Sequence, residues 1–199
     1  MTRRWFAFCA LCVAVGTLVA PPRAVAQADS VAFINQLGVQ AIQVLGPSVP
    51  MQQRVQRFHQ LFGADFDLPE IARFTLGRYW RVATPEQQQQ YLGLLQDYLA
   101  QAYAGRLAQY AGEKFAATNA QQQGGETIVF SEIARNDGSR IRVEWHLVNN
   151  GGWKITDAYV AGVSMKQTQR DEFLSIIARS PSGLDGLLAQ LRQKVAGAG

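Results

Sequence analysis

Residues 84–112, TPEQQQQYLGLLQDYLAQAYAGRLAQYAG, decide the fold because they predict one long helix. Thr84 can cap the helix with its hydroxyl, and Gln87 completes a capping box. Pro85 suits the first helical position, where the backbone N–H needs no partner. At about 1.5 Å per residue the helix would be on the order of 40 Å long. We expect the rest of the chain to pack around it.

Apolar side chains cover more of this helix than a single contact requires. They occupy an arc of about 220°, whereas a helix packed on one side needs little more than 100°. The helix is therefore predicted to touch two partners, a sheet on one side and either more helices or an apolar ligand on the other. Tyrosines such as Tyr98 and Tyr103 suit a ligand wall because they combine an apolar ring with a polar hydroxyl. A simple structural core explains the same pattern.

Residues 1–28 have the composition of a secretory signal peptide. Arg3 and Arg4 give a basic start, and residues 5–20 form an apolar run that is too short for a membrane span. Small residues around Ala26 and Ala28 provide a cleavage site. We therefore expect a cleaved leader at 1–28 and one domain at 29–199.

Removal of the leader changes the composition of the mature chain. Cys9 and Cys12 leave with it, so the mature domain has no disulfide, thiol nucleophile or cysteine metal site. Loss of Arg3, Arg4 and Arg23 lowers the Lys and Arg count from 19 to 16 against 15 Asp and Glu, a net charge of +1. This balance argues against nucleic acid as a partner. Roughly 170 residues can bury a sufficient core without cross-links.

The order of predicted elements indicates an α+β fold. Helices are expected from Asp29 or Ser30 to about 45, over about 50–62, and from Asp67 to Gly77, before the long helix. The pattern then changes to strands, with a polar loop at 121–125. Two helices follow the strands: one ends near 179, and the last begins near Ser182. The expected strands are 113–120, 127–134, 140–148 and 153–164. We predict N-terminal helices and one long helix packed on a curled antiparallel sheet of about four strands, with C-terminal helices.

Alternation along 140–148 predicts a half-buried strand. Ile141, Val143, Trp145 and Leu147 share the inward face, and charged residues and His146 share the other. An apolar cavity is expected between this inward face and the long helix. Its predicted ligand-binding residues are Tyr98, Tyr103, Leu107, Phe130, Val143, Trp145, Leu147, Tyr159 and Val163.

Candidate catalytic groups are few. The chain has two histidines, His59 and His146, and neither lies at metal-ligand spacing to another His, Asp or Glu. The chain also has no phosphate loop or nucleophile elbow. We predict no metal site, no cofactor and no catalytic residue. Asp157 is the exception to its strand's pattern, because it shares the parity of inward residues or marks a bulge. A buried carboxylate could act as a general base, or it could be structural with Arg106 as its partner.

Seven short motifs follow one another along the mature chain: FDLPEIAR at 66–73, LGRYW at 76–80, TPEQ at 84–87, YAGRL at 103–107, GWKITD at 152–157, GVSM at 162–165 and GLDGL at 183–187. In this order they resemble the MlaC family of periplasmic phospholipid-binding proteins, also called the toluene-tolerance family. The segment KQTQR at 166–170 departs from the Asn-Tyr-Arg found in many members. Some subgroups are linked to hopanoid loci, so a hopanoid-type lipid remains an alternative ligand.

The resemblance implies a cone like that of nuclear-transport-factor folds, with a cavity for lipid acyl chains and the head group in solvent. It implies a monomer in the periplasm that touches membranes transiently. The protein would shuttle phospholipid between an outer-membrane lipoprotein complex and an inner-membrane ABC transporter, and so support outer-membrane lipid asymmetry. It would not be an enzyme.

Physical chemistry is consistent with such a carrier. Burying an acyl chain yields about 0.8 kcal/mol per CH₂, so two chains of about sixteen carbons represent roughly 25 kcal/mol. A cavity that replaces the bilayer removes this aqueous barrier without catalytic residues. Two other hypotheses remain open: an enzyme of the same architecture with Asp157 as its base, and an interaction module without a ligand.

Overall fold

The protein is described by a computed structural model that covers residues 22–44, 48–106 and 113–197. Most of the predicted leader and the last part of the predicted long helix, including Leu107, lie outside these ranges. The described helices are α1 (Pro22–Val44), α2 (Met51–Asp65), α3 (Leu68–Leu76), α4 (Arg78–Val82), α5 (Pro85–Arg106), α6 (Met165–Arg179) and α7 (Leu184–Ala196).

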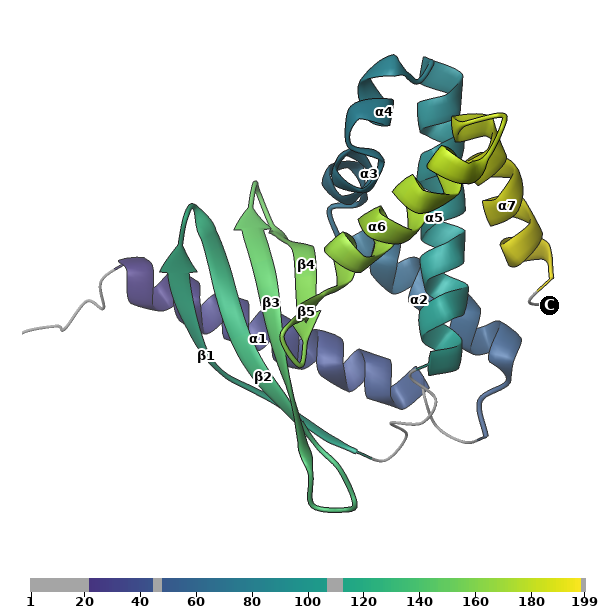
Figure 1. Ribbon diagram of the computed structural model, residues 1–199. Coiled ribbons are helices and arrows are strands. Elements are labelled where there is room, and N and C mark those ends of the chain that lie inside the picture. Colours follow the sequence, from purple (N-terminus) through teal and green to yellow (C-terminus); the bar gives the residue numbers. More distant parts are fainter. Residues whose placement is uncertain (1–21, 45–47, 107–112, 198–199) are drawn as a thin grey trace, which may run out of the picture.

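The strands form one antiparallel sheet in sequence order, which confirms the α+β class (Figure 1). They are β1 (Lys114–Gln123), β2 (Glu126–Ala134), β3 (Arg140–Asn149), β4 (Trp153–Val160) and β5 (Val163–Ser164). The fifth strand arises because Ala161 and Gly162 have φ of 51° and 82° and turn the expected last strand back on itself. Positive φ at both central residues is the requirement of a two-residue hairpin with a type I′ turn.

Capping signals placed the starts of α3 and α5 correctly. The Thr84 N–H donates to Gln87 Oε1 over 3.0 Å, and the Gln87 N–H donates to Thr84 Oγ1 over 3.2 Å, which is the predicted capping box. Asp67 caps α3 by accepting from the Glu70 N–H over 3.0 Å. Gly77, with φ of 52°, ends α3 as expected.

Three boundaries differ from the sequence predictions. Helix α1 begins at Pro22, and α2 continues through Gly63 to Asp65. The predicted polar loop at 121–125 is shorter, because residues 121–123 pair with β2 and only Gly124 and Gly125 turn. These glutamines extend an edge strand whose side chains remain exposed, so their polarity is compatible with pairing.

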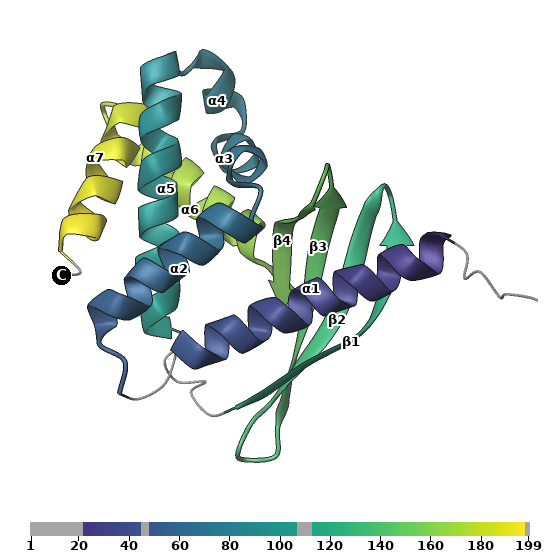
Figure 2. The same cartoon turned by 180° about the vertical axis from the view of Figure 1, so that it is seen from behind.

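Helix α1 lies along one face of the sheet, while the other helices gather beside the sheet (Figure 2). The long helix α5 was expected to pack on the sheet, but its packing partners are α2, α3 and α7, and α1 covers β1 and β2 instead. The wide apolar arc of α5 is thus buried mainly by helices on several sides. Periodicity revealed the width of the arc but not which element would cover it.

The described residues form two hydrophobic cores. One core is helical and includes Tyr91, Leu95 and Phe173. The other lies between α1 and the sheet and includes Ile34 and Leu147. None of the described helices is long and apolar enough to cross a membrane.

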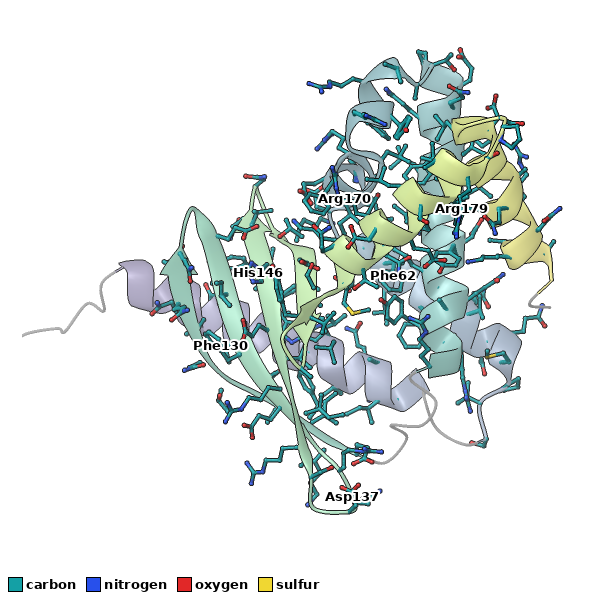
Figure 3. The ribbon with its side chains drawn as sticks, viewed as in Figure 1. Phe62, Phe130, Asp137, His146, Arg170 and Arg179 are labelled. Carbon is teal, nitrogen blue, oxygen red and sulfur yellow. The ribbon has the colours of Figure 1, made fainter. Side chains whose placement is uncertain are left out.

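Helix α6 joins the sheet to the helical core through its first two turns. The guanidinium of Arg170 donates to the carbonyl of Phe74 at the end of α3, and it also lies 5.1 Å from the centre of the Phe74 ring. Lys166 Nζ lies 3.5 Å from Glu70 Oε1 at the start of α3. Figure 3 shows Arg170 where α6 passes α3. The segment 166–170 is therefore helical and holds α3 and α6 together.

Candidate functional site

A cavity of about 370 Å³ lies where α1, the sheet and the helical core meet. This volume falls in the range of small-molecule sites, which is about 300–1,000 Å³. Helix α1 contributes Leu37, Ala41 and Ile42, and α2 contributes Phe58, Leu61 and Phe62. Figure 3 locates Phe62 on the helical side of this space.

The sheet and the remaining helices complete the wall. Strands β2 and β3 contribute Ile133, Ile141, Val143 and Trp145, and α6 contributes Met165. Because nearly all of these side chains are apolar, the cavity favours hydrocarbon over water.

The structure brings three predicted site residues to this wall: Tyr103, Val143 and Trp145. The Trp145 indole Nε1–H donates to Ser131 Oγ over 2.9 Å, which fixes the ring against β2. Its neighbour Leu147 faces inward as predicted but is fully buried between α1 and the sheet. Leu107 lies outside the described residues.

Tyr98 and Val163 are not on the cavity wall. The Tyr98 ring packs against Phe173 with ring centroids 5.7 Å apart, inside the helical core. Its hydroxyl lies 3.4 Å from Glu172 Oε2. Val163 is 58% exposed at the β4–β5 hairpin.

Phe130 and Tyr159 lie on the opposite face of the sheet from the cavity, so their expected inward parity was wrong. Phe130 pairs with Glu144 across β2 and β3, and Tyr159 stacks on His146 with ring centroids 4.8 Å apart. Residues 127–131 of β2 are nearly all buried, so burial on both faces hid the alternation. Figure 3 shows Phe130 on β2 and His146 on β3.

A bulge in β4 explains the position of Tyr159. The β3–β4 register shifts between His146 and Leu147, so that Ile155 faces Leu147 and Asp157 faces His146. Beyond the bulge, Ala158 and Val160 reach the cavity in place of the predicted residues. A bulge inserts one residue and reverses the parity that follows it.

Asp157, which is 3% exposed, holds the start of α6. One carboxylate oxygen accepts from the Ala158 N–H over 2.8 Å and from the Lys166 N–H over 3.0 Å. The other accepts from the Ser164 hydroxyl, whose oxygen in turn accepts from the Gln167 N–H over 3.0 Å. These bonds match the structural alternative for Asp157, with backbone N–H groups rather than Arg106 as partners.

A polar cluster lies behind the cavity wall at the β4 bulge. Glu126 Oε2 lies 2.9 Å from His146 Nδ1, and Glu126 Oε1 accepts from the Thr156 hydroxyl over 2.9 Å. Burial raises the pKa of Glu126, but the hydrogen bonds from His146 and Thr156 outweigh it, so the pKa lies below its ordinary value. Within the described part of the chain no three His, Cys, Asp or Glu side chains gather in a metal-binding group.

Three polar atoms of cavity-lining residues are buried without a hydrogen-bond partner, namely the Tyr103 hydroxyl on α5, Gln169 Oε1 on α6 and Glu113 Oε2 just before β1. Burial is the main cause that raises the pKa of Tyr103 to about 12. Arg106 also borders the cavity and is exposed. Sequence reasoning named Tyr103 but missed Gln169, because a glutamine in a helical pattern usually faces solvent.

Sequence reasoning also missed the contributions of α1 and α2. Their apolar faces were correctly identified, but such a face predicts burial against some neighbour and does not separate a packed core from a cavity wall.

Comparison with known proteins gives two findings. A model of the MlaC protein family matches residues 41–193. Among solved structures, the chain is similar to that of a phospholipid-binding protein from Ralstonia solanacearum in complex with a phospholipid. The two share 23% identity and a TM-score of 0.70, over 84% of this chain and 97% of that chain. This second likeness concerns the fold. Because the family model spans well over half of the sequence, the chain belongs to the MlaC family.

Proposed function

We propose that the mature protein is a periplasmic carrier of membrane lipid, and that phospholipid is its ligand. The apolar cavity carries this proposal: α1, α2, α3, α5, α6 and four strands all turn hydrophobic side chains into one space of about 370 Å³. A well-packed domain has few voids larger than a water molecule, so a space of this size needs an occupant or a function. The acyl chains would lie inside, and the head group would stay in solvent.

Arg106 supports a phospholipid over an uncharged lipid. It borders the cavity at the end of α5, is exposed, and forms no ion pair with the residues described. A guanidinium in this position can meet a phosphate through charge-assisted hydrogen bonds. The similar structure from Ralstonia solanacearum, which holds a phospholipid, also supports this choice.

The carrier would exchange lipid with an outer-membrane lipoprotein complex and an inner-membrane ABC transporter. Family membership and the predicted leader at residues 1–28 support this location and these partners. This exchange needs little driving force, because the free energy of lipid transfer is close to zero between a bilayer and a cavity that provides the same apolar environment.

The arrangement of Asp157 argues against the enzyme alternative. Both carboxylate oxygens accept hydrogen bonds from the chain itself, and two of the donors are backbone N–H groups. A general base needs a free lone pair within hydrogen-bond reach of the substrate proton.

Native mass spectrometry of detergent-free protein tests the proposal. Protein purified from membrane-containing cells, or incubated with phospholipid vesicles, should carry a mass that organic extraction identifies as a diacyl phospholipid. A parallel sample of Arg106→Gln should still hold lipid but bind anionic vesicles more weakly. Protein that never acquires lipid under either condition would contradict the carrier function.

A further inference from the structure

The wall of the cavity contains a polar side chain that the surrounding protein leaves unsatisfied. Gln169 is 4% exposed on α6, and its Oε1 has no hydrogen-bond partner. Tyr103 lines the same cavity from α5, and its hydroxyl is likewise buried without a partner. Glu113 Oε2 is a third such atom among the residues that line this cavity. Buried polar side chains nearly always have a partner, so these exceptions in one cavity indicate groups that a ligand satisfies.

The chemistry of the two groups limits what they can bind. Because burial raises the pKa of Tyr103 to about 12, its hydroxyl keeps its proton and can donate a hydrogen bond. The terminal amide of Gln169 carries two N–H donors and one acceptor, and half a turn about its last bond exchanges them. The pair is therefore suited to a ligand with hydrogen-bond acceptors among its apolar parts.

The ester linkage of a diacyl lipid has this character. A diacyl lipid has two ester linkages, and their carbonyl oxygens lie where the acyl chains join glycerol. These oxygens therefore follow the chains to the edge of the buried region. A polycyclic hydrocarbon such as a triterpenoid offers no acceptor along its buried length. Bound in this cavity, it would leave both protein groups unsatisfied, which carries a free-energy cost for each.

We propose that Tyr103 and Gln169 form a hydrogen-bonding subsite for the ester carbonyls of a diacyl glycerolipid. This inference rests on the proposed lipid-carrier function and adds to it a class of ligand. The subsite selects ester-linked glycerolipids over ether-linked and triterpenoid lipids, while the exposed head group remains free to vary.

Matched lipids test the subsite directly. The dissociation constants of a diester phosphatidylglycerol and its diether analogue, with the same chains, are measured with the parent protein and with Tyr103→Phe, Gln169→Leu and the double variant. The parent should prefer the diester by roughly three- to tenfold for each hydrogen bond. Each single variant should lose part of this preference, and the double variant should bind both lipids equally.

Two control variants lie on the same helices as these positions but away from the cavity wall. Tyr98→Phe removes a hydroxyl that lies beside Glu172 in the helical core. Gln167→Met removes an exposed amide that donates to Asp171 over 2.8 Å. Both should keep the parent's preference for the diester. A parent that binds diester and diether equally, or a double variant with the parent's preference, would overturn the subsite.

Thermal stability separates a ligand-binding role from a structural one. Lipid-free Tyr103→Phe and Gln169→Leu should melt at or above the temperature of the lipid-free parent, because each removes a buried unsatisfied atom. A marked fall in melting temperature would assign the two side chains to the fold and overturn the inference. Failure of the parent to bind either lipid would instead contradict the carrier function itself.

Discussion

The carboxylate of Asp157 on β4 accepts a hydrogen bond from the backbone N–H of Lys166, 3.0 Å away in the first turn of α6. The bond connects the bulged strand to the helix that carries Gln169 into the cavity wall. An acidic side chain near a helix N-terminus also interacts favourably with the helix dipole.

Asp157→Ala should therefore lower the free energy of unfolding by about 3 kcal/mol, because it leaves buried N–H donors without an acceptor. Urea denaturation measures this loss. Asp171→Ala, which removes an exposed carboxylate of α6, should lower the free energy of unfolding by less than about 0.5 kcal/mol. If Asp157→Ala unfolded like the parent but lost a measurable catalytic turnover, the enzyme alternative would be supported instead.

The ionised form of Glu126 should stabilise the fold above its ordinary pKa. Burial raises this pKa, but hydrogen bonds from His146 and Thr156 lower it below the ordinary value of 4.5. The stability is therefore fully present above the unfolded pKa and is lost as pH falls through the folded pKa. Glu126→Gln should show a smaller loss of stability than the parent between pH 5 and pH 3, measured by thermal unfolding.

Glu70 provides a comparison of opposite sign. Burial is the largest cause that raises its pKa, and the charge of Lys166 offsets this only in part. Its protonation favours the fold as the pH falls, so Glu70→Gln should make the acid loss of stability steeper than in the parent. If stability fell equally steeply with pH in Glu126→Gln and Glu70→Gln, the opposite directions of the two pKa shifts would be contradicted.

The sequence predicted those features that depend on neighbours along the chain. The capping box of Thr84 and Gln87 and the cap of Asp67 are local, so residue type and spacing were sufficient. The half-buried strand β3 was also identified, because its alternation is regular on one face. These signals established the α+β class.

Features that depend on distant partners were predicted only as alternatives or not at all. A bulge at Asp157 was one of two alternatives, but the pairing of β3 with β4 decides it and turns Tyr159 away from the cavity. Similarly, the apolar face of α1 was visible in the sequence, but its position over β1 and β2 depends on tertiary packing. The cavity residues from α1, α2 and α6 were therefore beyond a local pattern.

Gly38 allows α1 to approach β1 closely beside the cavity. A Cβ atom at this position would lie 2.2 Å from Cδ1 of Phe115, which is far inside van der Waals contact. Gly38→Ala should reduce stability by about 1–3 kcal/mol through overpacking, and adding Phe115→Leu should restore part of it. Gly93→Ala is the matched control, since a Cβ there meets nothing within 4 Å and alanine favours the helix. Unfolding of the single and double variants in urea decides between a specific clash and a general effect of losing glycine.

Filling the cavity should remove the lipid and leave the fold intact. Val143 is 3% exposed on β3 and lines the cavity, so Val143→Trp places a bulky indole ring in the space that acyl chains would occupy. The overpacking should cost about 1–3 kcal/mol, which a domain of ordinary stability tolerates. Val82→Trp, at a side chain that is 77% exposed on α4, controls for the added indole. Native mass spectrometry should detect lipid on the parent and on Val82→Trp but not on a folded Val143→Trp. Full lipid occupancy in Val143→Trp would place the acyl chains elsewhere and refute this cavity as the binding site.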